Sequence, residues 1–394
     1  MSALKNAAAI DQVLNDAVAS GAVPHAVAIA ADKDGVIYQG AAGPRTVGEN
    51  EAASPDTVFR IMSMTKMPCT VLALQAMEQG ILDLDAPVAN YCPEFAEVQV
   101  LTGFSDGVPQ LRPPASQATV KQLITHTSGL GYWFWNGDLV QWEQISGIPN
   151  VVAGSKSSLR APMVADPGTA FIYGINTDWL GQVVEAATGL PLDVAMKQNI
   201  TGPLGMDHTA FIMNDTDRAN CSPVHVKGED AQWSSIGEIL NQAPEYYAGG
   251  HGLYGPPSDY IKFERALLRG GELDGTRILK AETVAEAFRN QIGDLDFPAE
   301  IATADPASSA TLALGPGNKW GYGLLLNTAD IPGMRRAWSG GWAGLCNTHF
   351  WVDRASGICA SIYSNFVPFV TPEAVKMYND FERALYAALQ TRAG

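Results

Sequence analysis

The sequence predicts an α+β protein. An antiparallel sheet flanked by helices is built from both ends of the chain, and a mostly helical lobe is inserted between them. Near the N-terminus, the apolar runs Val27–Ala30 and Val36–Tyr38 flank an Asp32–Gly35 turn, a pattern typical of a hairpin. Strand patterns return only near the C-terminus. We therefore expect residues 1–62 and 245–394 to form the sheet lobe, residues 63–244 the helical lobe, and the functional site to lie between them.

Apolar periodicity and turn residues place the other elements. The first helix carries Ile10, Leu14 and Val18 on one face. Residues Thr102–Ser116, rich in Gly, Pro and Ser, are expected to form a surface loop. Helices are expected over Met64–Gln79, Val120–Ile124, Thr177–Ala187, Leu192–Gln198 and Asp259–Leu268, and from Thr371 onward. Strands are expected over Trp320–Leu326, Arg335–Ser339, Thr348–Val352 and Ile358–Tyr363.

Composition excludes several classes of function. The 394 residues are 46% hydrophobic and 17% charged, which is typical of a protein with a large core. A net charge of −16 argues against nucleic acid or an anionic membrane as partner. The five cysteines are scattered and form no C-x-x-C, so neither a disulfide framework nor a zinc site is expected. We expect a cytoplasmic protein without metal or cofactor, and leave open whether it is a homodimer.

An S-x-x-K pattern with a physical case for catalysis occurs at Ser63 and Lys66. Because proline is tolerated in a helix only near its first turn, Pro68 requires a helix start close to Ser63. The serine hydroxyl then lies beside unpaired backbone N–H groups, and a lysine three residues on shares its face. Burial could lower the pKa of that lysine so that it accepts the serine proton. The spacing alone is weak evidence, because Ser2 and Lys5 share it.

Two other motif matches are interpreted as coincidences. Gly103–Gly107 fits the G-x-S-x-G of α/β-hydrolases, but the prolines that follow prevent a helix after its serine. Gly250–Gly255 fits the dinucleotide pattern G-x-G-x-x-G, but it lacks a preceding apolar strand, and Pro256 and Pro257 follow it. We interpret this second segment as a turn or as part of a substrate pocket.

From Ser63 onward the chain resembles the superfamily of class C β-lactamases, penicillin-binding proteins and family VIII carboxylesterases. The landmarks match in order over nearly the whole chain: Ser63–Lys66 resembles S-x-T-K, Leu123–Leu130 resembles L-L-x-H-T-S-G-L, and Pro167–Tyr173 resembles P-G-x-x-F-x-Y. The resemblance implies a β-lactamase/penicillin-binding-protein-like fold. It also implies that Ser63 is the nucleophile, Lys66 its proton partner and Tyr173 the third catalytic residue. Whether Lys66 or Tyr173 is the principal base stays open at this point.

The third family box is K-T-G in β-lactamases and W-x-G in esterases, and we assign it to Trp338-Ser339-Gly340-Gly341. By analogy, the backbone N–H of Gly341 joins that of Ser63 in the oxyanion hole. A tryptophan cannot hold a substrate carboxylate as the box lysine does. The second box also lacks the asparagine of Y-x-N, since Asn176 comes one position late. Residues expected to bind substrate are Trp338, Gly340, Tyr132, Trp133 and Tyr254.

Both departures resemble the esterase branch, so we expect a carboxylesterase that hydrolyses short-chain esters through an acyl-enzyme on Ser63. The partner is then a small-molecule ester. An acyltransferase, in which an alcohol replaces water, is the first alternative. A β-lactamase or D-Ala-D-Ala peptidase and a non-catalytic binding protein on the same fold are the others. We expect His126 to be structural, and assign no role to His251.

Overall fold

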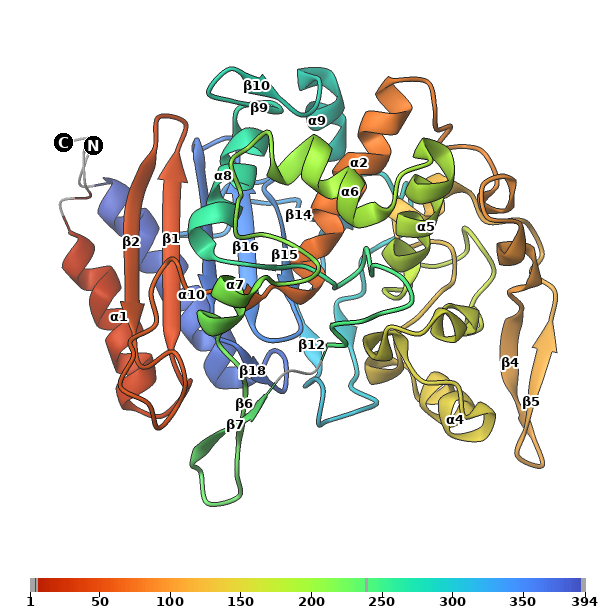
Figure 1. Cartoon of the computed structure of the whole chain (residues 1–394), viewed down its shortest axis with the longest axis horizontal. Coiled ribbons are helices and arrows are strands. Elements are labelled where there is room, and N and C mark those ends of the chain that lie inside the picture. The colour runs from red at the N-terminus through yellow and green to blue at the C-terminus, as the bar shows by residue number, and fades with distance from the viewer. Residues whose placement is uncertain (1–3, 5, 238–239, 391–394) are drawn as a thin grey trace.

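A seven-stranded antiparallel sheet forms the centre of the computed structural model, which describes residues 4, 6–237 and 240–390. Its strand order is β13-β14-β15-β16-β17-β1-β2, so strands from the two chain ends lie side by side (Figure 1). The pairing of Val27 with Tyr363 joins those ends. The expected fold class is confirmed. The strands are β1 (Ala26–Asp32), β2 (Val36–Ala42), β13 (Asn318–Trp320), β14 (Leu325–Asn327), β15 (Gly340–Gly344), β16 (Thr348–Asp353) and β17 (Ile358–Tyr363).

Helices cover both faces of this sheet. On one face α1 (Ala7–Ala19) packs beside α10 (Pro372–Gln390), and α8 (Pro257–Leu268) packs on the other face against β1 and β17. Beyond α8 lie α2 (Lys66–Glu78), α5 (Asn176–Thr188) and α6 (Leu192–Met196), which form most of the helical region (Figure 1). The shorter helices are α3 (Val120–Ile124), α4 (Gly137–Ser146), α7 (Asp215–Ala219) and α9 (Ala281–Ala287). The lobe boundaries at 62/63 and 244/245 stay a prediction.

Short strands tie the loops together. They are β3 (Phe59–Arg60) with β8 (Tyr254–Gly255), β4 (Val100–Ser105) with β5 (Val108–Arg112), β6 (Val224–Lys227) with β7 (Trp233–Gly237) and β18 (Phe366–Val367), β9 (Glu272–Leu273) with β10 (Thr276–Arg277), and β11 (Glu300–Ile301) with β12 (Leu312–Ala313). The β4–β5 pair corrects the loop expected over Thr102–Ser116. Asp106 and Gly107 both have positive φ there, the geometry that an Asp-Gly hairpin turn requires.

Two strand predictions near the C-terminus were also wrong. No strand forms over Arg335–Ser339, because the carboxylates of Asp353 and Asp330 accept the backbone N–H groups of Arg336 and Ala337. Trp338 has a left-handed φ of 63°, which ends any extended run before β15. The strand expected over Trp320–Leu326 is two strands, β13 and β14, separated by a turn at Gly323 with φ 74°.

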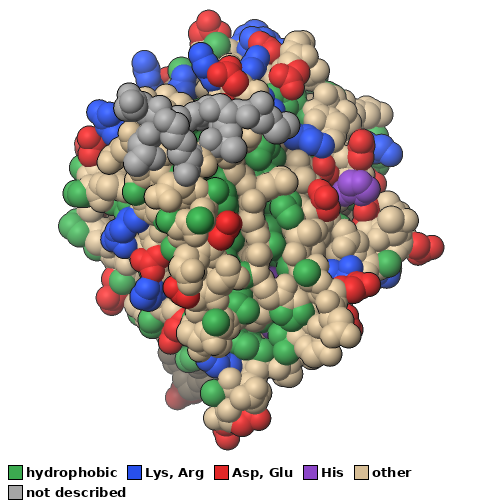
Figure 2. Space-filling view, turned by 90° about the vertical axis from the view of Figure 1, so that its left-hand side faces the viewer, with side chains coloured by type: hydrophobic (Ala, Val, Ile, Leu, Met, Phe, Trp, Pro, Cys, Tyr) green, Lys and Arg blue, Asp and Glu red, His purple; other side chains and the backbone are tan. Residues whose placement is uncertain are grey.

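One face of the molecule carries charges of both signs. Figure 2 views the molecule from the side of α1 and β2 and shows acidic and basic side chains intermixed on that face. Among the residues described, no helix has the length and apolar character needed to cross a membrane. No group of His, Cys, Asp or Glu within this part of the chain is arranged to hold a metal ion.

Candidate active site

Ser63 lies in a single 3-10 turn, Met62–Thr65, that leads directly into α2. Strand β3 fixes the entry to this turn by pairing with β8, where Phe59 is opposite Gly255. Helix α2 begins at Lys66, so Pro68 occupies its first turn as the sequence predicts. Ser63 is 8% exposed and therefore stands at the edge of the buried interior, just before the positive end of α2.

Lys66 extends from the first residue of α2 toward Ser63, and it is almost completely buried. Its Nζ lies 3.1 Å from Ser63 Oγ, 2.9 Å from the hydroxyl of Tyr132 and 2.8 Å from the carbonyl oxygen of Gly250. These hydrogen-bond partners are all uncharged oxygens. Burial without direct neutralisation lowers the pKa of Lys66 to about 7, although the more distant charge of Asp178 raises it.

Tyr173 completes the contacts around the nucleophile. Its ring packs against the buried ring of His126, with the centroids 4.6 Å apart and the planes tilted by 37°, and Lys66 Nζ lies 4.8 Å from its centroid. Its hydroxyl accepts a 2.7 Å hydrogen bond from Trp342 Nε1. Burial raises the pKa of Tyr173, and hydrogen bonds with Ser63 and Trp342 offset only part of this effect. Tyr173 is therefore a neutral hydroxyl near neutral pH.

Asp178 is the buried carboxylate behind Lys66, in the first turn of α5. Its Oδ1 accepts the backbone N–H of Gly250 at 3.0 Å and lies 3.3 Å from His251 Nδ1. Its Oδ2 accepts from the Tyr132 hydroxyl at 3.4 Å. The charge of His251 opposes the effect of burial, so the pKa of Asp178 is lowered. Gly250 thus links the two charges, because its carbonyl contacts Lys66 and its N–H contacts Asp178.

The third box lies four residues later than the sequence analysis placed it. Trp338 is 46% exposed and precedes β15, whereas Trp342 lies within β15 and contacts Tyr173. A Cβ added to Gly344 would come within 2.3 Å of the carbonyl oxygen of Ile61, so this end of β15 lies against the turn that carries Ser63. Gly340 and Gly341 lie three to four residues earlier on the strand, about 10–13 Å away at 3.3 Å per residue.

This correction has a simple cause. The pattern W-x-G occurs twice in succession, as Trp338-Ser339-Gly340 and as Trp342-Ala343-Gly344. Only the second copy lies entirely within β15, with its glycine against the turn that carries Ser63. Gly340 instead packs against Phe288 and Leu324, and Gly341 faces the opposite side of the sheet.

The Beta-lactamase family model matches residues 10–385, which is almost the whole chain. The chain belongs to the Beta-lactamase family. It is 31% identical to Monacolin J acid methylbutanoyltransferase of Aspergillus terreus, over 97% of this chain and 96% of that protein. It is also 31% identical to Lovastatin esterase of Penicillium rubens, over 89% of this chain and 90% of that one. A mutant of simvastatin synthase from Aspergillus terreus has a similar structure, with a TM-score of 0.84, 29% identity and coverage of 97% of both chains.

The structure shows the contacts of the other residues expected to bind substrate, and their role in binding stays a prediction. Tyr132 lies in the site, but as a hydrogen-bond partner of Lys66. Trp133 Nε1 donates a hydrogen bond to Asp305. The guanidinium of Arg60 lies over the ring of Tyr254, and Tyr254 lines a small cavity together with His251. Asn176 is buried and donates to the carbonyl of Leu130, so it faces away from Ser63. The Ser2–Lys5 match lies outside the described residues.

Sequence reasoning missed three members of the site: Asp178, His251 and Trp342. The sequence did offer one signal for Asp178. It follows the predicted catalytic residue Tyr173 by five residues and lies in the first turn of α5. His251 belongs to the glycine-rich Gly250–Gly255 segment, which the sequence analysis interpreted as a turn or part of a substrate pocket. His126 proves to support the ring of Tyr173 and to contact Asn176, with its Nδ1 2.9 Å from Asn176 Nδ2.

Proposed function

We propose that this member of the Beta-lactamase family is a serine carboxylesterase that transfers the acyl group of a small-molecule ester to Ser63 and then to water. The observation that carries the proposal is the buried Lys66 amine, 3.1 Å from Ser63 Oγ, with only uncharged oxygens as hydrogen-bond partners. An amine with a pKa of about 7 is partly neutral at physiological pH and can accept a proton there.

In the acylation step, Ser63 Oγ attacks the ester carbonyl while its proton passes to Lys66. Lys66 is the better candidate for the base, because burial lowers the pKa of Lys66 and raises the pKa of Tyr173. The neutral Tyr173 hydroxyl, which hydrogen-bonds with Ser63, gives its proton to the departing alkoxide and takes up the proton that Lys66 accepted, so both groups return to their starting forms. When the tetrahedral intermediate collapses, the ester C–O bond breaks and the alcohol leaves. Water then attacks the acyl-enzyme with the same groups in reverse.

The negative charge on the carbonyl oxygen needs backbone donors. We assign this role to the N–H groups of Ser63 and Leu345, the residue that follows the Trp342-Ala343-Gly344 box. Two contacts support the assignment: the close approach of Gly344 to Ile61, and the hydrogen bond of 3.2 Å from Thr348 Oγ1 to the Ile61 carbonyl. The first contact brings the end of β15 against the Ser63 turn, and the second does the same for the start of the paired strand β16.

Acyl transfer to an alcohol is the second candidate, and the similarity to an acyltransferase over nearly the whole chain favours it. The two activities share the acyl-enzyme and differ only in what attacks it. A β-lactamase or D-Ala-D-Ala peptidase is less well supported, because the corrected box has Trp342 where such enzymes carry a lysine. A non-catalytic binding protein would have no need for a lysine held at its serine.

The test compares wild type and Ser63→Ala on p-nitrophenyl esters of graded acyl length, with nitrocefin and an added alcohol in parallel assays. Loss of the nucleophile is expected to lower kcat/KM on the best ester roughly 10⁴-fold or more. Equal rates for the two proteins would refute the assignment of Ser63. Faster turnover of nitrocefin than of every ester would refute the substrate class, and an ester product formed from the added alcohol would identify acyl transfer.

A matched pair of tryptophan variants tests the corrected box. Trp342→Phe removes the hydrogen bond to the Tyr173 hydroxyl while keeping an aromatic ring. We expect kcat/KM to fall by about 10-fold, in line with a hydrogen bond to a catalytic group. Trp338→Phe changes an exposed side chain and is expected to leave the rate within about 2-fold of wild type. A larger loss in Trp338→Phe than in Trp342→Phe would restore the first copy of the motif.

A further inference from the structure

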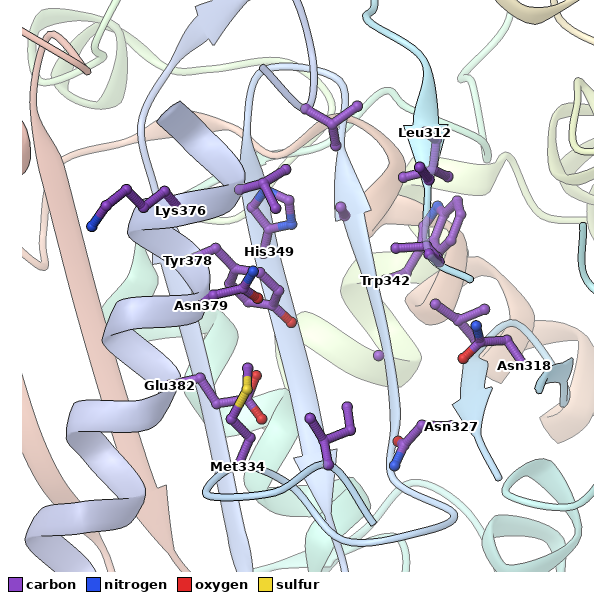
Figure 3. A pocket seen from close by; sticks show the side chains of 18 of the residues that line it. Leu312, Asn318, Asn327, Met334, Trp342, His349, Lys376, Tyr378, Asn379 and Glu382 are labelled. Carbon is purple, nitrogen blue, oxygen red and sulfur yellow. The ribbon is translucent and has the colours of Figure 1, made fainter. Parts of the chain in front are cut away.

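A large cavity lies between the central sheet and α10, and its lining reaches Trp342, the residue that contacts Tyr173. Its volume is about 990 Å³, within the range of about 300–1,000 Å³ that is usual for small-molecule sites. Side chains alternate along β15, so Trp342 and Gly344 face the nucleophile while Gly341 and Ala343 face α10. The small size of these last two residues leaves the space between β15, α10 and β12 unfilled (Figure 3).

The walls of this cavity are mainly apolar. They come from four parts of the chain, and Figure 3 shows them surrounding one common space. The apolar lining includes Leu312, Leu325, Ile331, Met334, Phe369 and Val375. A ligand that fills the space must therefore present mostly hydrocarbon to the protein.

One polar atom in the wall has no hydrogen-bond partner. His349 lies on β16 opposite Ala343, and its ring is held between Tyr378 at 4.5 Å and Phe369 at 5.9 Å, with 21° between the ring planes in each pair. The residue is 7% exposed, and its Nε2 is buried and unpartnered. Burying such an atom without a partner is destabilising, so the site lacks one hydrogen bond. Burial and the charge of Arg335 lower the pKa of His349 to about 3, so the ring is neutral.

The charged side chains in the wall are already paired with one another. Glu382 accepts from Arg335 Nε at 2.8 Å, and Asp380 pairs with both Lys376 and Arg383. The cavity therefore offers no unpaired charge to an ionised ligand. A neutral histidine can donate or accept through Nε2 according to its tautomer, and a hydroxyl group can serve either way.

We propose that this cavity binds a neutral, predominantly apolar alcohol whose hydroxyl group pairs with Nε2 of His349 and whose hydrocarbon part contacts Leu312, Leu325 and Met334. Trp342 lines the cavity and also contacts Tyr173, but Ser63, Lys66 and Tyr173 are not part of its wall, and the inference does not depend on the esterase activity. Such a ligand would fill the apolar space and also supply the hydrogen-bond partner that His349 Nε2 lacks.

The test measures binding of 1-decanol by isothermal titration calorimetry, with 1-chlorodecane and decanoate as probes of similar length. We expect the wild type to bind 1-decanol roughly 3- to 10-fold more tightly than 1-chlorodecane, the range that one net hydrogen bond gives. His349→Phe keeps a ring between Tyr378 and Phe369 but removes the nitrogen. It should abolish this preference while retaining affinity for 1-chlorodecane.

A second variant tests the location without touching the histidine. Val375→Trp places a large side chain in the cavity from α10 and should weaken the binding of both neutral probes at least 10-fold. Val140→Trp, a half-buried valine on α4, is the matched control and should bind as the wild type does. Thermal unfolding of each variant verifies that it is folded. Tighter binding of decanoate than of 1-decanol would refute the ligand class, and binding that neither His349→Phe nor Val375→Trp alters would refute the site.

Discussion

Lys66 is a buried cation and Arg335 is a largely buried one, with 12% of its side chain exposed, but the protein treats their charges in opposite ways. Lys66 lies on the catalytic side of the sheet with uncharged oxygens as hydrogen-bond partners. Arg335 lies on the α10 side, where its guanidinium forms two hydrogen bonds with the carboxylate of Glu382, at 2.8 Å and 2.5 Å, and its backbone N–H forms a third at 2.9 Å. It also contacts the Tyr378 hydroxyl and lies 4.8 Å from the ring of Trp351.

The difference shows what each cation is suited to do. Burial lowers the pKa of Lys66 to about 7, so its proton can leave and return at physiological pH. Burial also opposes the charge of Arg335, but Glu382 and Tyr378 more than offset this effect and the pKa of Arg335 rises. A permanently charged, fully paired group contributes to structure, whereas an unneutralised one is available for chemistry. Substitution at each position should therefore affect different properties.

The largest effect on activity is expected from Lys66→Met, which keeps an unbranched side chain and removes the amine. Loss of a general base should lower kcat/KM on the best ester by roughly 10²–10⁴-fold. Stability should stay the same or increase, because a buried charge without a carboxylate partner disappears. Ester hydrolysis and thermal unfolding, measured on the same preparation, test both expectations. A strongly destabilised but active Lys66→Met protein would make Lys66 a structural residue.

The largest effect on stability is expected from Arg335→Met, which leaves the fully buried carboxylate of Glu382 without its partner. Removing one member of a buried pair costs about 3–5 kcal/mol. Chemical denaturation should show this loss, while the kcat of the folded fraction stays close to that of the wild type. The double variant Arg335→Met/Glu382→Leu removes both charges and should recover much of the stability. Equal stability of wild type and Arg335→Met would mean that the pair with Glu382 does not stabilise the fold, so Arg335 would have no structural role to set against the catalytic role of Lys66.

Much of this arrangement could be predicted from the sequence, because local rules determine it. The hairpin at β1 and β2, the helix start required by Pro68 and the ordered motifs through Tyr173 all depend on neighbouring residues. The same local rules led to an error at β15. Two W-x-G copies stand four residues apart, and only the turn geometry at Trp338 and the approach of Gly344 to Ile61 show which copy faces the nucleophile.

Long-range pairing explains what the sequence could not show. Asp178 and His251 are far apart in the chain, and they meet because α5 and the Gly250–Gly255 segment both pack behind Lys66. Arg335 and Glu382 likewise come from a loop and a helix that pack against the same part of the sheet. No spacing rule connects such pairs, so their charges could not be assigned before the fold was known.

The pH dependence of ester hydrolysis sharpens the comparison because, of these two cations, Lys66 alone should titrate in the working range. A general base acts when it is deprotonated, so kcat/KM is expected to rise with pH through an acid limb near the Lys66 pKa of about 7. Arg335 stays charged throughout and contributes nothing to this limb. A rate that is constant from pH 5.5 to 8.5 would mean that Lys66 is not the base.

The smallest effects are shifts of that limb by the charges behind Lys66. His251→Gln removes the imidazole that partners the Asp178 carboxylate, so this carboxylate should act more fully on Lys66 and the limb should move to higher pH. Asp178→Asn removes the negative charge that raises the pKa of Lys66, so the limb should move lower. The matched control is His208→Gln, which breaks a surface His–Asp pair of 2.6 Å and should leave the profile unchanged. If His251→Gln and Asp178→Asn both lower the rate without shifting the limb, or shift it in the same direction, they act on packing and not on the charge of Lys66. Opposite shifts would show that Lys66 is tuned by distant charges, whereas Arg335 is fixed by a direct partner.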